Sequence, residues 1–168
     1  MTKLHETIET ELSPAATFDF VADFANSMYW DPGVATSERI GDGPVAVGAR
    51  YKLGVRMRGQ VAPMEYHVSE FEPGHRVVLI GAGSGVNAVD EIRFERAGTG
   101  TRVDYTADIN LGGWMRLVQP FVGGAFRKIA KDALGGMQQA LDERAAQEAA
   151  AQEAAAQAAG AAAGEVLA

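Results

Sequence analysis

Residues 49–57 read ARYKLGVRM, and apolar side chains occupy every second position of this stretch. Arginine and lysine fill most of the positions between them. Successive side chains of a strand point to opposite faces of a sheet, so this alternation indicates a strand with one buried face and one solvated face. The stretch therefore predicts a half-buried strand of an antiparallel sheet.

Further segments of the same kind follow, and glycine-containing turns separate them near positions 58–59, 72–75, 81–85 and 97–100. Each tight turn fixes which residues lie opposite one another. The predicted pairs are Tyr51 with Tyr66, Val68 with Leu79, Leu79 with Ala88, and Asp90 with Ala107. One concave face results, made of Tyr51, Leu53, Met64, Tyr66, Val68, Leu79, Ala88, Asp90, Ile92, Tyr105, Ala107 and Ile109.

Helices are predicted on both sides of this run of strands. Near the start, Leu4 and Ile8 indicate one more strand, and Ser13 with Pro14 is a typical helix start, because serine caps well and proline suits the first turn. A long helix is predicted from about 113 past Leu141. Its sheet-facing side chains are expected to be Phe126, Ile129, Ala130, Ala133, Met137 and Leu141. A curved sheet closed by one long helix tends to leave an apolar space between them, so the order of elements predicts a ligand container.

The beginning of that long helix is unusual. Proline and paired glycines interrupt an almost wholly apolar stretch over 114–124. Proline removes a hydrogen bond and bends a helix axis. The interpretations are ordinary core packing and a mobile apolar gate at the mouth of the container.

Composition narrows the function classes. The chain has 168 residues, a formal net charge of -7 and no cysteine. The acidic balance disfavours nucleic-acid binding, which depends on clustered Lys and Arg, and the lack of cysteine excludes disulfides and thiolate chemistry. No stretch approaches the ~20 apolar residues of a membrane helix, so we expect a cytoplasmic protein without integral membrane association. One domain over 1–144 and an alanine-rich, solvent-exposed tail over 145–168 are predicted, with partner binding by the tail as the alternative.

A resemblance to a known family rests on turn and strand motifs: Tyr29 to Pro32, Val47 to Tyr51, Val68 to Val77 and Gly98 to Val103. The chain resembles the START-like (SRPBCC) superfamily, and more narrowly its polyketide cyclase/dehydrase and lipid-transport family, over about residues 2–144. The resemblance implies an α+β helix-grip fold, in which a seven-stranded curved antiparallel sheet wraps around the long C-terminal helix. It also implies a cavity for a lipid, polyketide or quinone-like ligand. It transfers no catalytic residue, because the family shares no single catalytic set.

Asp90 is the most unusual residue of the concave face. Its predicted neighbours are Val77 and Ala107, and an apolar pocket raises the pKa of a carboxyl group, which suits a proton donor or general base. Tyr66 or Tyr105 would donate a hydrogen bond to a developing oxyanion, and Glu6 shares the inward parity. The alternative is a structural Asp90 at a bulge or the mouth, satisfied by a hydroxyl or amide group.

Two functions remain open. The first is binding of a small hydrophobic molecule in a cavity of about 300–1,000 Å³. The second is aldol cyclisation or dehydration in the same cavity, with Asp90 as acid/base and Tyr66 or Tyr105 as electrophile. We expect no cofactor and no metal site, because the three histidines do not converge. A weak homodimer and contacts through the arginine-rich strand are left open. The predicted ligand-binding residues are Trp30, Tyr51, Met64, Tyr66, Leu79, Asp90, Ile92, Tyr105 and Phe121.

Overall fold

The computed structural model describes the backbone of residues 2–57, 59–112 and 119–166, and within the last helix it describes side chains mainly over 127–159. The strands are β1 (Thr2–Thr10), β2 (Val34–Ile40), β3 (Arg50–Met57), β4 (Gln60–Glu72), β5 (Arg76–Gly83), β6 (Val86–Ala97) and β7 (Gly100–Leu111). The helices are α1 (Pro14–Ala22), the 3-10 helix η1 (Phe24–Asn26), α2 (Ser27–Trp30) and α3 (Gln119–Val166).

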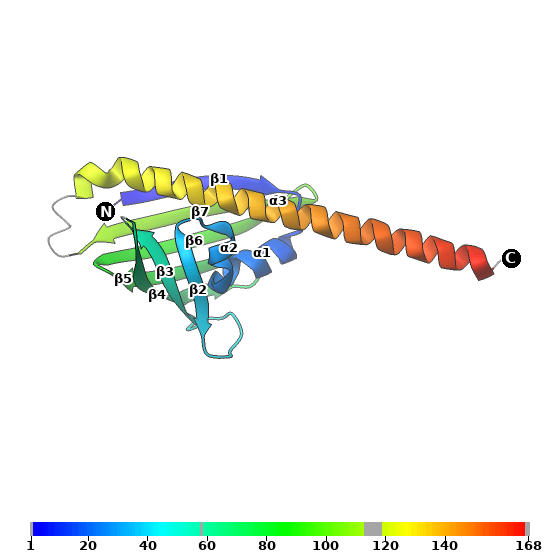
Figure 1. Ribbon diagram of the computed structural model, residues 1–168, viewed down its shortest axis with the longest axis horizontal. Helices are drawn as coiled ribbons and strands as arrows, with labels where there is room; N and C mark the ends of the chain where they lie inside the picture. Colours follow the sequence, from blue (N-terminus) through cyan, green and yellow to red (C-terminus); the bar gives the residue numbers. More distant parts are fainter. Residues whose placement is uncertain (1, 58, 113–118, 167–168) are drawn as a thin grey trace.

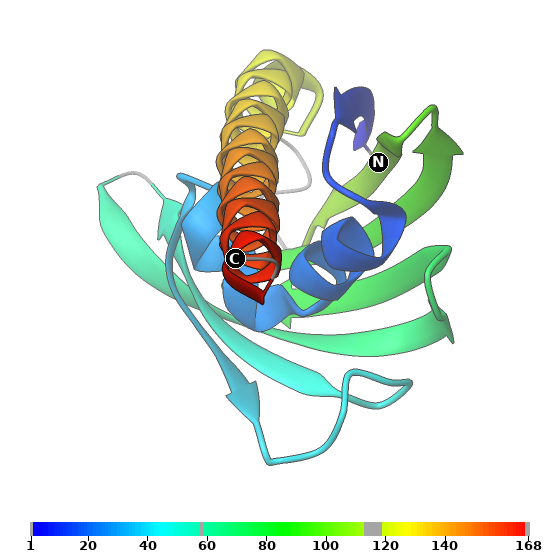
Figure 2. The same ribbon diagram turned by 90° about the vertical axis from the view of Figure 1, so that its right-hand side faces the viewer.

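The sheet is antiparallel, with seven strands in the order β1-β7-β6-β5-β4-β3-β2 (Figure 1). Strands β2 to β7 form a meander, and β1 pairs with β7 at the other end. The connection from β1 to β2 carries α1, η1 and α2 across the concave side, and the sheet curves around α3 (Figure 2). The predicted α+β helix-grip fold is therefore confirmed. The residue pattern had not located β2, whose edge position leaves a polar, half-exposed strand.

The predicted register is confirmed in most hairpins. Tyr51 lies opposite Tyr66, and Val68 lies opposite Leu79. Asp90 pairs with Ala107 on β7, as its parity predicted.

The prediction for the β5–β6 hairpin was wrong by two residues. Leu79 lies opposite Asp90 rather than near Ala88, so the apolar neighbour of Asp90 on β5 is Leu79 and not Val77. The strands run further than expected, because a tight turn at Ser84 and its following glycine, with φ of 52° and 75°, reverses the chain. Positive φ at both central residues is typical of the hairpin turn that matches strand twist. A slip of two residues preserves the faces, so the side chain of Asp90 still points inward.

Helix α1 fills one part of the concave face. It begins after Ser13, whose side chain accepts a hydrogen bond from the Ala16 N–H at 3.4 Å. Phe18 packs on the sheet with ring centroids 5.4 Å from Phe71 and 5.1 Å from Phe94. This half of the sheet therefore has a solid core beneath α1.

Helix α3 covers the remainder. Ala133, Leu134, Met137 and Leu141 are buried, whereas Ile129 is 52% exposed and faces the open space between α3 and the sheet. Phe126 lies outside the side chains that the structure describes. The residues of the gate hypothesis over 114–118 also lie outside the described residues, and those over 119–123 are described as backbone only.

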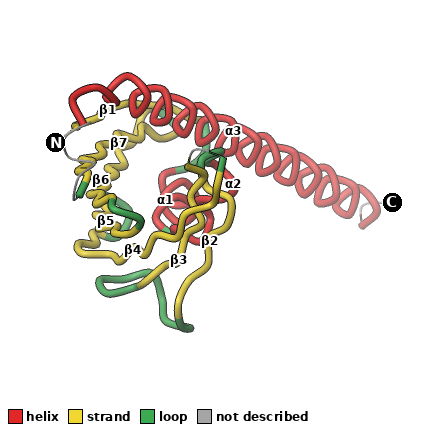
Figure 3. The backbone as a smooth tube through the Cα atoms, turned by 60° about the vertical axis from the view of Figure 1, so that its left-hand side comes forward, coloured by secondary structure: helices red, strands yellow, loops and turns green. Residues whose placement is uncertain are grey.

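Close contact with α2 fixes the position of α3. A Cβ atom at Gly136 would lie 2.2 Å from the Trp30 carbonyl oxygen, so only glycine allows this approach. Beyond this contact α3 continues to Val166, and its residues over 146–159 are exposed where the helix projects past the sheet (Figures 1 and 3). The division into a domain and a tail stays a prediction.

Candidate functional site

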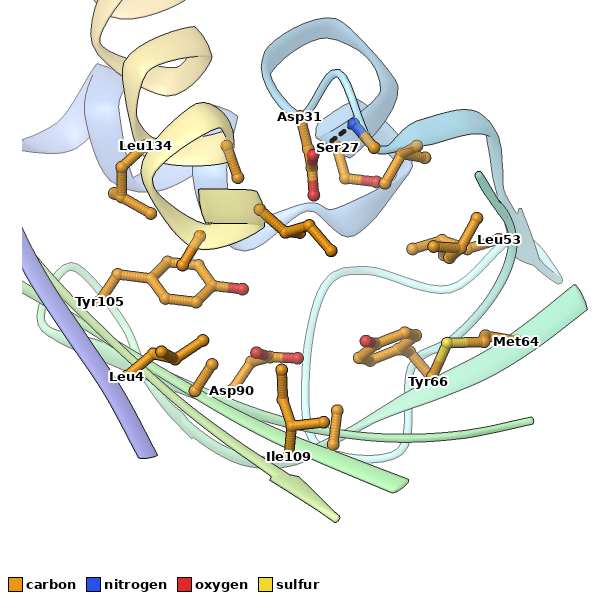
Figure 4. Close-up of a pocket in the computed structure, with 18 of the residues that line it drawn as sticks. Leu4, Ser27, Asp31, Leu53, Met64, Tyr66, Asp90, Tyr105, Ile109 and Leu134 are labelled. Atoms are coloured by element: carbon orange, nitrogen blue, oxygen red, sulfur yellow. Dashed lines mark hydrogen bonds between the residues drawn. The ribbon is translucent and has the colours of Figure 1, made fainter. Parts of the chain in front are cut away.

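A pocket lies between α3, α2 and the part of the concave face that α1 leaves uncovered (Figure 4). Its volume is about 210 Å³, below the range expected from sequence. Side chains from β3, β4, β6, β7 and α3 make most of its wall apolar, notably Leu53, Met64, Val86, Ile109 and Leu134. Alternating strand residues supply this wall, because each strand presents every second side chain to the concave side.

Asp90 is the polar centre of the pocket. The residue is 5% exposed, and its carboxyl group lies between the side chains of Tyr66 and Tyr105 (Figure 4). Burial raises the pKa of Asp90 to about 7, while the hydroxyl groups of Tyr105 and Tyr66 act in the opposite direction by stabilising the carboxylate. The group can therefore take up or release a proton near neutral pH.

The two tyrosines are held as neutral phenols. Burial raises the pKa of Tyr66 and of Tyr105 well above 10, and the nearby Asp90 charge adds to this effect. Tyr66 comes from β4 and Tyr105 from β7, on either side of Asp90 in β6. Two neutral hydroxyl donors and one carboxyl group thus converge on the same space.

A second carboxyl group enters from the opposite wall. Asp31 follows α2, and its Oδ1 accepts a hydrogen bond from the Gly33 N–H at 2.7 Å. Burial raises the pKa of Asp31, whereas the Gly33 N–H and the charge of Arg56 lower it. The Arg56 guanidinium, at the rim, donates to the carbonyl oxygens of Pro32 at 2.9 Å and Val34 at 2.6 Å.

Aromatic rings connect the two carboxyl groups around the pocket. Phe24 packs 5.9 Å from Trp30 and 5.3 Å from Tyr66, measured between ring centroids. Trp30 in turn lies 6.4 Å from Tyr105. Because all four rings line the pocket, its polar centre is enclosed by aromatic as well as aliphatic surface.

A family model described as polyketide cyclase / dehydrase and lipid transport matches residues 1–142. The chain belongs to this family. None of the curated protein sequences matches the chain.

Solved structures share the fold of this family member. A START superfamily protein from Mycobacterium smegmatis is 19% identical, with a TM-score of 0.66 and coverage of 88% of this chain and 99% of that chain. The Zhui aromatase/cyclase from Streptomyces is 11% identical, with a TM-score of 0.70 and coverage of 88% and 94%. A conserved protein from Geobacillus kaustophilus is 18% identical, with a TM-score of 0.65 and coverage of 85% and 96%. At these identities the likeness establishes the fold and transfers no residue role.

The structure divides the predicted site residues of this family member into two groups. Those that line the pocket are Trp30, Met64, Tyr66, Asp90 and Tyr105. Those that do not are Tyr51, Leu79 and Ile92, which are 0% exposed and belong to the main core cluster. The parity prediction placed them on the concave face, but the packing of the helices closes the space above them. Phe121 lies in α3, and its side chain lies outside the described residues.

Glu6 and His5 lie at the margin of the pocket. Glu6 lines the pocket but is exposed, so its carboxyl group stands at the mouth rather than beside Asp90. His5 hydrogen bonds to Thr106 at 3.1 Å.

Among the residues that the structure describes, no group of three potential metal ligands comes together. None of the described helices is long and apolar enough to cross a membrane.

Sequence reasoning missed Asp31 and Ser27, both of which line the pocket. Ser27 to Trp30 form the short helix α2 rather than a break in a helix, and the turn that follows begins at Asp31, whose carbonyl oxygen accepts from the Val34 N–H at 2.9 Å. The available signal was a carboxyl group directly after a buried tryptophan. Its direction, however, depends on how α2 packs against α3, and local sequence does not contain that information.

Proposed function

We propose that this domain binds a small, mostly apolar molecule in the pocket and orients it by hydrogen bonds to Asp90, Tyr66 and Tyr105. The observation that carries the proposal is the buried carboxyl group placed between two neutral phenols in an otherwise apolar space. An unpaired buried carboxyl group is costly, and Asp90 forms no ion pair within the described part of the chain. The carboxylate accepts from the Tyr105 and Tyr66 hydroxyl groups, and because a carboxylate can accept about four hydrogen bonds, a donor group of a ligand could bind beside them.

The family description and the pocket volume support a class of ligand. The family description names polyketide chemistry and lipid transport, which favours a polyketide, lipid or quinone-like molecule. A pocket of about 210 Å³ favours a compact ring system over a long acyl chain. Native mass spectrometry of the protein purified from its own host tests this directly, because a co-purifying small molecule would identify the class.

A matched pair of variants tests the location of binding. Ala88 is buried in the pocket wall, and Ala88→Phe would fill the space. Val89 is the next residue of β6, points to the outer face and is 39% exposed, so Val89→Phe is the control. We expect Ala88→Phe to abolish binding of the neutral fluorescent probe N-phenylnaphthylamine, and Val89→Phe to retain it. Equal probe binding by both variants, with native circular dichroism spectra, would place the ligand elsewhere.

A second candidate function is aldol cyclisation or dehydration of a polyketone. It is favoured by one observation, a carboxyl group whose pKa is raised to about 7 beside two phenols. Asp90 would move the proton at the reacting carbon, and Tyr66 or Tyr105 would donate to the oxyanion that develops. If Asp90→Asn binds the polyketone but no longer converts it, the enzyme proposal gains support, and unchanged conversion would remove it.

A further inference from the structure

The pocket combines an aromatic enclosure with carboxyl groups on opposite walls. Asp31 stands on the α2 side and Asp90 on the sheet side, and Tyr66 and Tyr105 flank Asp90 (Figure 4). The two carboxyl groups are close enough to interact, because the charge of Asp31 raises the pKa of Asp90 and of both tyrosines. We infer that the ligand carries a protonated amine, which is seated between Asp31 and Asp90 inside the aromatic rings. This inference rests on the proposed function and specifies the chemistry of its ligand.

The balance of charge inside the pocket supports a cation. Arg56 is the one described lining residue with a fixed positive charge, and its guanidinium is exposed and donates to backbone carbonyl oxygens at the rim. A ligand carboxylate would add a further negative charge near Asp31 and Asp90, where low dielectric strengthens repulsion. An ammonium group would instead compensate both carboxylates and donate hydrogen bonds to them.

The aromatic rings favour the same ligand. Ring faces carry partial negative charge and attract ammonium groups, more strongly where water is excluded. Phe24, Trp30, Tyr66 and Tyr105 form a continuous series of ring contacts beside the carboxyl groups. Ser27 adds a buried hydroxyl group in the pocket wall that has no hydrogen-bond partner within the described residues. The pocket therefore surrounds the polar end of a ligand with hydrogen-bond acceptors and ring faces on several sides.

The groups around Asp90 determine how binding depends on pH. Tyr105 and Asp108 come from β7 and Tyr66 from β4. Further out, β1 contributes the exposed Glu6 and His5, and β3 contributes Arg56, whereas the described α3 residues that line the pocket are uncharged. Because Asp90 ionises near neutral pH, an ammonium ligand should bind more tightly as the pH rises from about 6 to about 8.

Three probes with one ring system test the inference: naphthylmethylamine, naphthylmethanol and naphthoate, titrated by calorimetry against the full-length protein. We expect the amine to bind at least about tenfold more tightly than the alcohol at pH 8, as expected for hydrogen bonds between charged groups, and naphthoate to bind weakest. Asp31→Asn and Asp90→Asn should each reduce this preference, and Asp90→Asn should remove most of its pH dependence. The matched control is Asp19→Asn, which replaces an exposed carboxyl group on α1. It should change neither the preference for the amine nor the pH dependence of binding.

The outcomes separate this inference from the proposed function. If the alcohol binds as tightly as the amine, the amine preference is overturned and binding of an apolar ligand stands. If naphthoate binds best, the ligand is an anion and the charge argument is wrong. If none of the three probes binds, both proposals are overturned. Thermal unfolding of each variant confirms that a loss of binding is not a loss of fold.

Discussion

Replacing the Asp90 carboxyl group by an amide should change how stability depends on pH. In the unfolded chain the pKa of this group is near 3.8, and burial raises it to about 7 in the folded protein. Between these values the folded state binds more protons than the unfolded state, so the free energy of unfolding falls as the pH rises. The contribution of Asp90 to the free energy of unfolding is fully present below about pH 4 and is lost by about pH 7.

The magnitude follows from the same two values. At about 1.4 kcal/mol for each pKa unit, the gap between 3.8 and about 7 corresponds to a loss of about 4 kcal/mol. The Asp90→Asn variant carries no charge at this position and avoids this loss. Relative to wild type, its free energy of unfolding should therefore rise by about 4 kcal/mol between about pH 4 and about pH 8.

Urea unfolding followed by far-ultraviolet circular dichroism at several pH values measures this difference. Taking the difference between variant and wild type cancels contributions from the other titrating groups. Asp19→Asn on the exposed side of α1 is the control and should give a difference that does not vary with pH. A pH-independent difference for Asp90→Asn as well would show that the folded protein does not raise the pKa of Asp90, and the reasoning about this site would fail.

Three further predictions concern the site, the helix contact and the tail. Tyr105→Phe removes a hydroxyl group that stabilises the Asp90 carboxylate, so the pKa of Asp90 should rise, as measured by carbon NMR of the carboxyl group. Gly136→Ala should destabilise the fold by about 1–3 kcal/mol, because its methyl group would meet the backbone of α2, whereas Gly135→Ala has open space and should be neutral or stabilising by chemical denaturation. Deleting residues 146–168, which are exposed over 146–159, should change the free energy of unfolding by less than about 0.5 kcal/mol; a larger loss would indicate that the tail packs on the domain.

Much of the sheet could be predicted from local pattern. Alternation fixed the faces of β3 to β7, and Ser13 with Pro14 located the start of α1. Turn chemistry gave most registers, but at Ser84 the chain uses a shorter turn than the glycine-rich stretch suggested. Strand β2 gave no clear signal in the sequence. It is an edge strand that buries little apolar surface, so its apolar and polar residues do not alternate clearly.

The site could be predicted only in part. The period of a strand places Asp90, Tyr66 and Leu79 on one face, and this much is a local property. Which of them borders an open space depends on where α1 and α3 pack, and those contacts join residues far apart in the chain. Leu79 consequently lies in solid core, while Asp90 faces the pocket.

The sequence by itself determined that a curved antiparallel sheet turns an apolar face with one carboxyl group toward a long helix, because alternation and capping act over a few residues. Only the tertiary structure decided that the opposite wall brings in Asp31, since a loop residue has no periodicity and its direction is set by the packing of α2 against Gly136. The second carboxyl group of the pocket therefore depends on that long-range contact.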